Sequence, residues 1–406
     1  MVEKFAIKIL VIDDDSFMLK LLAQMLANLG YTQVTACDSG DRALKLIDRP
    51  HSAADLVLCD LNMPEMDGIE FVRELVARRY TGSLILVSGE DERVLQTAEK
   101  LVQAHRITVL GRLGKPPTPE GLVALLDKWS PPSQAAGRAA KKPYSADEVR
   151  AAITNGELVN YYQPKVTVAT GEVAGVESLV RWRHPVDGMV FPDQFIGVAE
   201  THGLIDDLTR VVLAGALAQD HAWRKAGLVL QVAVNVSMDN LRSLDFPDIV
   251  ARQTAAAGVA PQDVMLEVTE SRVMNELRDA LEILTRLRLK RFGLSIDDFG
   301  TGHSSLAQLR DIPFDELKVD RSFVHGAHTN STIRAIHLAS VDLAKRLGMK
   351  IVAEGIEDID DWYFVYSTGC NLAQGYFIGK PMPASELPSW MAGWQKRVSS
   401  GFLAKA

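Results

Sequence analysis

The sequence predicts an α/β protein in which a doubly wound parallel sheet is followed by a (β/α)8 barrel. Three observations lead to this prediction. Short β-branched runs alternate with amphipathic stretches before residue 130, and a segment of prolines, small residues and cations follows at 130–143. After it, strand-like and helix-like stretches alternate over about 250 residues, the usual size of such a barrel. We therefore expect domains at 1–129 and 144–400, joined by a linker at 130–143.

Composition and charge argue against several classes of function. Hydrophobic residues make up 47% and charged residues 24% of the chain, as in an ordinary globular protein. The 52 acidic residues outnumber the 44 basic ones, and no basic stripe occurs, so we expect no binding to a nucleic-acid polymer.

The cysteines and apolar runs predict a cytoplasmic protein. Cys37, Cys59 and Cys370 are odd in number and far apart, which suits a reducing compartment better than a disulfide framework. The amino-terminal apolar stretch is interrupted by Lys8 and lacks the features of a signal peptide. No run approaches the ~20 apolar residues of a membrane helix, so we expect no membrane insertion.

Five β-branched runs define the predicted sheet of the first domain. They lie at about residues 7–12, 34–36, 56–59, 84–87 and 108–110. The stretch 17–29 between the first two places Leu19, Leu22, Leu26 and Leu29 on one helical face. Polar residues stand where the strands end, and the carboxyl ends of parallel strands share one edge of the sheet. These residues are Asp13, Asp14, Asp15, Asp60, Ser88 and Lys115.

Carboxylates, a hydroxyl and an ammonium at one edge would form a small site for a divalent cation and a phosphoryl group. Mg²⁺ prefers carboxylate oxygens and water. A carboxylate beside the cation can accept a phosphoryl group, whose oxygens lysine and serine would stabilise. The alternative is a purely structural domain whose acids cap strands and helices.

Four stretches of the first domain carry a family resemblance: ILVIDDDSF, LVLCDLNMPEMDG, LILVSGE and GKP. In this order they resemble the receiver domain of two-component response regulators, which has a flavodoxin-like fold. The resemblance implies that Asp60 is phosphorylated by a sensor histidine kinase or a phosphotransfer protein, beside one Mg²⁺. It implies a receiver site made of Asp13, Asp14, Ser88 and Lys115. Arg112 departs from the family pattern, which often has an aromatic switch residue three positions before the lysine.

Apolar runs of the second region carry polar residues at or near their ends. In a barrel the carboxyl ends of all strands meet on one face, where activity is found. So many carboxylates would repel one another unless cations neutralise them, and oxygen ligands favour Mg²⁺ or Mn²⁺ over zinc. Two such ions would suit phosphoester hydrolysis. The polar residues are Glu177, Asn235, Glu267, Glu270, Asp297, Asp298, Lys318, Asp320 and Glu354.

Nine stretches of the second region carry a second resemblance: YYQPKV, ESLVRW, HPVDGMVFPDQFI, NVS, LEVTE, DDFGTGHSSL, LKVD, AEGIE and AQGYFIGKPMP. They resemble the EAL domain, a cyclic di-GMP phosphodiesterase family with a modified TIM barrel. The resemblance implies two Mg²⁺ or Mn²⁺ ions held by Glu177, Asn235, Glu267, Asp297, Asp298 and Asp320. It implies catalytic roles for Glu177, Lys318 and Glu354, and dinucleotide contacts from Gln163, Arg181 and Gln374. Glu270 and the loop 299–304 would link the metal site to a dimer interface between EAL domains.

Two residues depart from the EAL pattern, and three histidines are candidates for a metal site. Ser178 stands where the family signature has alanine, and His303 stands where the loop usually has tyrosine; we expect the first change to cost little activity. His325, His328 and His337 share no ligand spacing, so we expect no metal site there.

Taken together, the two resemblances predict a response regulator that hydrolyses cyclic di-GMP to the linear dinucleotide pGpG. Phosphorylation of Asp60 would modulate this activity, and the chain would form a homodimer or higher oligomer through its EAL domains. The alternatives are a catalytically inactive cyclic di-GMP receptor and a scaffold that acts in a phosphorelay through its receiver domain.

Overall fold

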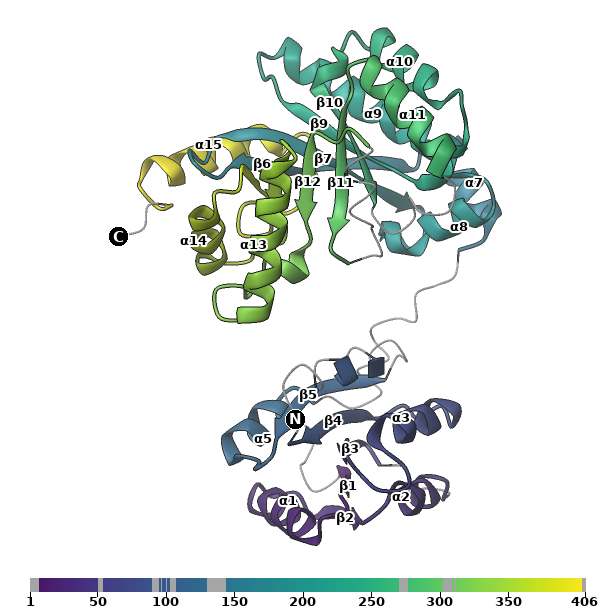
Figure 1. Ribbon diagram of the computed structural model, residues 1–406. Coiled ribbons are helices and arrows are strands. Elements are labelled where there is room, and N and C mark those ends of the chain that lie inside the picture. The colour runs from purple at the N-terminus through teal and green to yellow at the C-terminus, as the bar shows by residue number, and fades with distance from the viewer. Residues whose placement is uncertain are drawn as a thin grey trace. The chain divides into compact units, whose positions relative to one another are not determined.

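The chain forms two compact units, Met1–Lys141 and Lys142–Ala406, in the computed structural model (Figure 1). The structure describes residues 7–49, 54–89, 107–129, 144–269, 277–301 and 312–403, together with Leu95, 97–99, 101–102 and Leu309. Each unit has hydrophobic core clusters of its own. The predicted linker at 130–143 lies outside the described residues, so its boundaries stay a prediction.

The first unit is a doubly wound sheet of five parallel strands in the order β2-β1-β3-β4-β5. The strands are β1 (Lys8–Ile12), β2 (Gln33–Cys37), β3 (Leu56–Asp60), β4 (Ser83–Ser88) and β5 (Thr108–Gly114). The helices are α1 (Ser16–Asn28), α2 (Gly40–Ile47), α3 (Gly68–Ala77) and α5 (Pro119–Leu126). Alternate residues of β1 and β3 pack against α1 and α5 on one face and against α2 and α3 on the other. The predicted fold class is confirmed for this unit.

One strand of this sheet is longer than its sequence pattern predicts. The apolar run ends at Leu110, but β5 continues to Gly114. The register with β4 shifts between Leu84 and Ile85, and Gly111 beside this shift has φ +142°. A residue with this φ is tolerated because it is glycine, and the bulge lets the strand continue beyond the apparent end.

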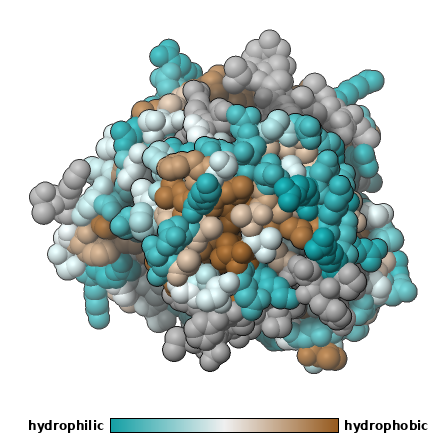
Figure 2. Space-filling model, turned by 90° about the horizontal axis from the view of Figure 1, so that it is seen from below, coloured by the Kyte–Doolittle hydropathy of each residue, from teal (hydrophilic) through white to brown (hydrophobic). Residues whose placement is uncertain are grey.

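Strand β2 is the edge of the sheet nearest the viewer when the molecule is seen from below. In this view apolar residues gather at the centre of the face within a hydrophilic rim (Figure 2). A hollow of about 320 Å³ along β1 and β2 is lined by Ile9, Val34, Leu46 and Ile47 among others. The predicted site residues Asp13 and Asp60 lie instead at the carboxyl ends of β1 and β3.

The second unit is a closed barrel of eight strands with two short additional strands at its ends. The barrel strands are β6 (Leu158–Thr167), β7 (Val173–His184), β9 (Gln231–Val236), β10 (Val264–Thr269), β11 (Gly293–Phe299), β12 (Glu316–Val319), β13 (Lys350–Ala353) and β14 (Leu372–Ala373). The additional strands are β8 (Gly188–Val190) and β15 (Met382–Pro383). Strand β6 closes the barrel by pairing antiparallel with both β7 and β14, while the remaining barrel strands are parallel. This reversed strand is the modification of the predicted (β/α)8 barrel.

Helices cover the outside of the barrel. They are α7 (Ala146–Thr154), α8 (Ile196–Thr201), α9 (Ile205–Lys225), α10 (Phe246–Ala256), α11 (Leu277–Leu289), α13 (Ser331–Arg346), α14 (Ile359–Thr368) and α15 (Leu387–Ser399). Short 3-10 helices lie at η2 (Pro192–Gln194), η3 (Met238–Arg242), η4 (Pro261–Asp263) and η6 (Arg321–Phe323). Helix α7 begins at a capping box in which Ser145 and Glu148 bond each other's backbone amides. Among the described residues, no helix is both long and apolar enough to cross a membrane.

The structure corrects where several site residues lie on their strands. Glu177 lies inside β7, which continues for seven residues to His184, and Glu267 lies inside β10. Lys318 is likewise inside β12. Asp320, Glu354 and Gln374, by contrast, directly follow β12, β13 and β14. The alternation of side chains places the strand-internal residues in the barrel interior, while the backbone continues beyond them.

Candidate active site

The receiver unit brings its predicted site residues together around Lys115. The Lys115 Nζ atom lies 2.8 Å from Asp13 Oδ2 and 2.8 Å from Asp60 Oδ2. Asp13 and Asp60 are buried, Asp14 is exposed, and carboxylate oxygens of these three aspartates are close enough together to hold one cation. Asp15, by contrast, caps α1 by accepting a hydrogen bond from Phe17 N at 2.8 Å.

Burial and ion pairing shift the pKa values at this edge. Burial raises the pKa of Asp13, although the hydrogen bond from Lys115 opposes the shift. Burial disfavours the charge on Lys115, but its hydrogen bonds to Asp13 and Asp60 outweigh this and raise the pKa of Lys115. The paired charges therefore keep the lysine protonated beside Asp60.

The other predicted receiver residues lie at the ends of β4 and β5. Ser88 is buried at the end of β4, and its carbonyl oxygen accepts a hydrogen bond from Lys115 N at 2.9 Å. The Lys115–Pro116 peptide bond is cis. Arg112, which departs from the family pattern, forms an ion pair with Glu99 at 3.1 Å.

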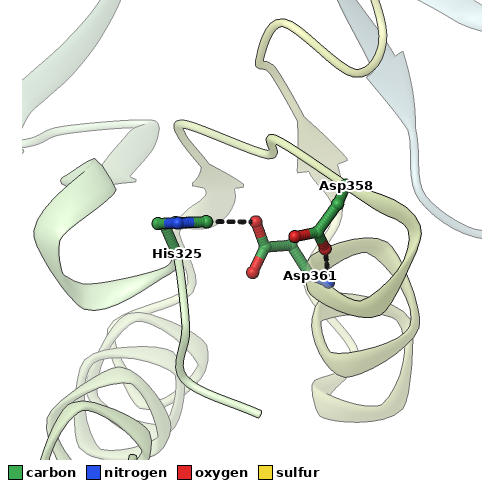
Figure 3. Close-up of side chains that lie close together, drawn as sticks. All are labelled: His325, Asp358 and Asp361. Atoms are coloured by element: carbon green, nitrogen blue, oxygen red, sulfur yellow. Dashed lines mark hydrogen bonds and ion pairs between the residues drawn. The ribbon is translucent and has the colours of Figure 1, made fainter. Parts of the chain in front are cut away.

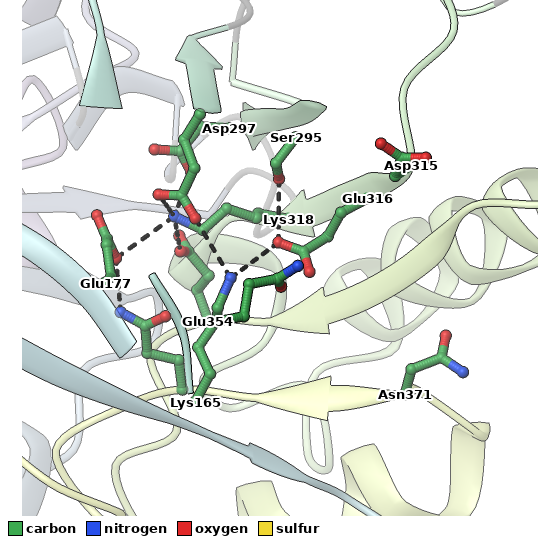
Figure 4. A network of polar contacts seen from close by, with 12 residues as sticks. Lys165, Glu177, Ser295, Asp297, Asp315, Glu316, Lys318, Glu354 and Asn371 are labelled. Carbon is green, nitrogen blue, oxygen red and sulfur yellow. Dashed lines mark hydrogen bonds and ion pairs between the residues drawn. The ribbon is translucent and has the colours of Figure 1, made fainter. Parts of the chain in front are cut away.

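In the barrel unit, carboxylates from four strands converge on Lys318, whose side chain is 1% exposed (Figure 4). The Lys318 Nζ atom lies within 3.5 Å of one oxygen from each of four carboxylates. The distances are 2.8 Å to Glu354 Oε1, 2.9 Å to Glu267 Oε2, 3.0 Å to Asp297 Oδ1 and 3.5 Å to Glu177 Oε2. Because each acid lies on or directly after a different strand, only closure of the barrel brings them together.

Amide side chains complete the contacts of Glu177. Asn235 donates to Glu177 Oε1 at 2.8 Å, and Gln374 donates to Glu177 Oε2 at 2.6 Å. Gln374 also donates to Gln163 Oε1 at 3.1 Å. Of the predicted substrate residues, Gln374 is thus linked directly to a predicted metal ligand, and Gln163 is linked to it through Gln374.

The site opens into a cavity of about 270 Å³. Its lining includes the predicted residues Gln163, Glu177, Asp297, Lys318, Glu354 and Gln374. It also includes Leu179, Arg321, Gly355, Glu357, Gly375 and Tyr376, which sequence reasoning did not single out. Arg321 directly follows Asp320 and pairs with Glu357, so its position beside a predicted site residue was the available signal.

The acids fall into two groups whose oxygens could hold a cation. One group is Glu177, Glu267 and Asp297, and the other is Asp297, Asp298 and Glu354. Asp298 has φ +55°, a left-handed conformation that aspartate tolerates better than most residues. Asp320 is in neither group; it caps η6 by accepting from Ser322 N at 2.9 Å. Its negative charge nevertheless acts on Asp298.

Burial in this acidic site raises several carboxyl pKa values. Burial raises the pKa of Glu267 to about 8, with Lys318 opposing the shift. Burial and the neighbouring charges of Asp297 and Asp320 raise the pKa of Asp298 to about 6. For Glu177, the nearby Lys318 and the amide hydrogen bonds outweigh burial and lower the pKa. The site concentrates negative charge, and its all-oxygen donor set fits hard divalent cations.

The remaining predicted residues either do not line the cavity or lie outside the described residues. Arg181 lies on β7, donates to Val180 O at 2.8 Å and packs over Tyr161 and Phe191, with ring centroids 5.8 and 5.2 Å from its guanidinium carbon. It is not among the residues that line the cavity. Glu270 and residues 302–304 of the loop, which include His303, lie outside the described residues.

Two of the three histidines lie beside the same carboxylate, since His328 Nδ1 is 3.6 Å from Asp361 Oδ1 and His325 contacts the other oxygen. His325 Nδ1–H donates to Asp361 Oδ2 at 2.8 Å, near Asp358 (Figure 3). These acids already have protein partners, because Asp358 caps α14 and Asp361 accepts from Gly326 N and Glu357 N. His337 is buried elsewhere, on α13. The cluster in Figure 3 therefore anchors the segment after β12 to α14.

Comparisons with known proteins identify both units. The EAL domain model matches residues 146–381, and the response regulator receiver domain model matches residues 9–127. The cyclic di-GMP phosphodiesterase RocR of Pseudomonas aeruginosa is 32% identical over 390 residues, which cover 95% of this chain and 99% of RocR.

Other relatives match the barrel unit alone. The cyclic di-GMP phosphodiesterase NbdA of P. aeruginosa is 40% identical over 259 residues, which cover 64% of this chain and 33% of NbdA. A solved structure of the phosphodiesterase MucR, in complex with cyclic di-GMP, is 40% identical with a TM-score of 0.57, and the match covers 59% of this chain and 98% of that chain. MucR is also a P. aeruginosa protein. The chain belongs to the EAL domain family and carries a response regulator receiver domain ahead of its EAL domain.

Proposed function

We propose that the chain is a cyclic di-GMP phosphodiesterase that releases pGpG under the control of its receiver domain. The observation that carries the proposal is the convergence of four carboxylates on the buried Lys318 at the carboxyl face of the barrel. RocR, which matches this chain over nearly its full length, is a cyclic di-GMP phosphodiesterase. Each acid that the resemblance implies for cation binding is present in the chain.

EAL domains depend on divalent metals, and the donor set here fits two Mg²⁺ or Mn²⁺ ions. The ligands would be Glu177, Asn235, Glu267, Asp297, Asp298 and Asp320. Bound divalent cations would lower the pKa of water and offset charge on the phosphodiester oxygens. Lys318 would then be released from part of its carboxylate contacts and would orient the attacking water. Glu354, whose pKa burial raises, would be suited to accept the proton of that water.

The dinucleotide would be held by groups on both sides of the cation ligands. The amides of Gln163 and Gln374 lie against Glu177, where they can contact the sugar-phosphate ring. The Arg181 guanidinium has the fork geometry that suits a phosphate oxygen. Glu270 would connect the site to a dimer interface between EAL domains.

The receiver unit would control this activity through Asp60. Its carboxylate lies beside Lys115 and close to two further aspartates that would hold one Mg²⁺ with it. A sensor histidine kinase or phosphotransfer protein would supply the phosphoryl group. Ser88, at the end of the neighbouring strand, would respond to the modified aspartate.

The test is to incubate the full chain with cyclic di-GMP and Mg²⁺, with and without acetyl phosphate, and to quantify pGpG. We expect metal-dependent release of pGpG, loss of at least about 100-fold in E177A because a cation ligand is removed, and a change in rate with acetyl phosphate that D60N lacks. The matched control is E172A, an exposed glutamate just before β7, which should keep the parent rate. Binding of cyclic di-GMP without any pGpG would contradict the enzymatic proposal and favour an inactive receptor.

A further inference from the structure

Beneath the acids of the candidate active site, the barrel interior holds an ion pair that the proposed reaction does not use. The Lys165 Nζ atom lies 3.0 Å from Glu316 Oε1, and the side chains are 1% and 0% exposed (Figure 4). Ser295 Oγ donates to the same Glu316 oxygen at 3.2 Å. These three side chains form a small polar cluster inside the barrel.

Strand geometry explains why the cluster lies directly below the active site. Glu316 and Ser295 are each two residues before a site residue, Lys318 and Asp297, so they share its inward face at a deeper level. Ser295 and Glu316 are also register partners. Strand β6 runs in the opposite direction, so its deeper residues come later in the chain. Lys165, two residues after Gln163, therefore lies at the same depth as Glu316 and Ser295.

Most of the surroundings at this depth are apolar or small. The residues two positions before Asn235, Glu267 and Glu354 are Ala233, Met265 and Val352, and all three are buried. Taking two charges out of water in such surroundings is unfavourable, so a buried ion pair is a poor source of stability by itself. In addition, Glu316 Oε2 is buried without a hydrogen-bond partner among the described residues. The pair therefore calls for a reason other than stability.

That reason is the contact of Lys165 with Glu267. The two carboxylate oxygens of Glu267 are divided between two lysines, with Oε1 at 3.4 Å from Lys165 Nζ and Oε2 at 2.9 Å from Lys318 Nζ. Lys165 thus restrains the carboxylate from below. Because Glu316 balances its charge, Lys165 can donate to Glu267 without reducing the net negative charge that attracts cations to the site.

We propose that Lys165, held in place by Glu316 and Ser295, is a positioning residue that orients Glu267 for cation binding. The inference rests on the proposed function only in taking Glu267 as a cation ligand. Groups that hold metal ligands in place in this way affect metal affinity about 10–100-fold.

The test measures Mn²⁺ binding without substrate, from the EPR signal of free Mn²⁺. All proteins are full-length and carry D13N and D14N, so that the receiver site does not contribute. K165M/E316Q removes both charges together and leaves no buried unpaired charge, so it should fold. We expect it to raise the Mn²⁺ dissociation constant at least about tenfold. K350M, which removes an exposed lysine at the start of β13, should bind as the parent does.

Kinetics provide a second measurement. In K165M/E316Q we expect kcat to fall at fixed Mn²⁺ and to recover partly with excess Mn²⁺, while KM for cyclic di-GMP stays within about twofold, since outer contacts of this kind act through the metal. E316Q keeps an acceptor for Lys165 but leaves its charge unbalanced, so it should also weaken Mn²⁺ binding.

Several outcomes would overturn the inference. A folded K165M/E316Q protein that binds Mn²⁺ as tightly as the parent would show that the pair has only a structural role. If that variant does not fold, parent-like Mn²⁺ binding by E316Q would overturn the inference instead. A parent that binds Mn²⁺ but releases no pGpG would contradict the proposed function, and the Mn²⁺ comparison would still decide the role of Lys165.

Discussion

At the scale of single residues, His337 shows how burial away from the active site creates a pH dependence. Its side chain is fully buried, packs on Phe364 with ring centroids 4.9 Å apart and lies 3.4 Å from Thr368 Oγ1. Burial disfavours the imidazolium and lowers the pKa of His337 to about 4. In the unfolded chain a histidine has its ordinary pKa of about 6.5.

The sign of the resulting effect is that acid destabilises the barrel unit. Between pH 6.5 and 4 the unfolded state binds a proton that the folded state does not. The free energy of unfolding therefore decreases as the pH is lowered through this range. The change is about 1.4 kcal/mol per pH unit and about 3 kcal/mol in total. Urea unfolding at pH 7, 6 and 5 should show a shallower pH dependence for H337Q than for the parent. An exposed-histidine control, H202Q, should keep the parent slope, and equal slopes in all three proteins would contradict this account.

At the scale of elements, the loops after β13 and β14 approach each other closely at the active site. A Cβ atom at Gly375 would lie 2.2 Å from both Ile356 N and Ile356 O, which belong to the loop after β13. Gly375 directly follows Gln374, whose amide bonds Glu177 and Gln163. The missing side chain therefore allows the two loops to meet and places Gln374 against Glu177.

We expect G375A to push these loops apart. Overpacking of this kind costs about 1–3 kcal/mol of stability, and displacement of Gln374 should lower kcat/KM for cyclic di-GMP about tenfold or more, because displacements near 1 Å can be that costly. Thermal unfolding and steady-state kinetics measure both effects. G393A is the matched control, since no atom lies within 4 Å of its Cβ on α15 and alanine favours a helix. Parent-like activity of folded G375A would contradict the role of this close approach.

At the scale of the whole molecule, the two units hold separate acidic sites on separate cores. The receiver site contains Asp13, Asp14 and Asp60, and the barrel site contains the acids around Lys318. A ligand that binds only the folded state raises its free energy of unfolding by about 2.7 kcal/mol at 100 times its dissociation constant. Each unit should therefore respond to Mg²⁺ on its own.

Calorimetry of the full chain should show two unfolding transitions, both shifted upward by Mg²⁺. We expect D13N/D14N to remove the shift of one transition and E267Q to remove the shift of the other, because each change deletes cation ligands in one unit only. The parent without added Mg²⁺ identifies the unshifted positions. If either variant removed both shifts, the two sites would not be independent.

Local patterns predicted much of the fold and of the acidic site. The strand-end positions of Asp13, Asp60 and Ser88 follow from apolar runs whose ends are visible in the sequence. The EAL resemblance implied roles for Glu267 and Lys318, which the barrel brings together. The full length of β5 escaped prediction because Gly111 interrupts its pattern at a bulge.

The sequence by itself determined the α/β class of the two domains and supplied the acids and lysines of both candidate sites, because these depend on short-range periodicity and on residue chemistry. Only the tertiary structure decided that β6 is reversed and closes the barrel. It alone brought Lys165 to Glu316, 151 residues away, and Gln374 to Glu177, 197 residues away. Such contacts depend on barrel closure and strand register, which are set by pairing between distant segments. The sequence of any one segment therefore does not show them.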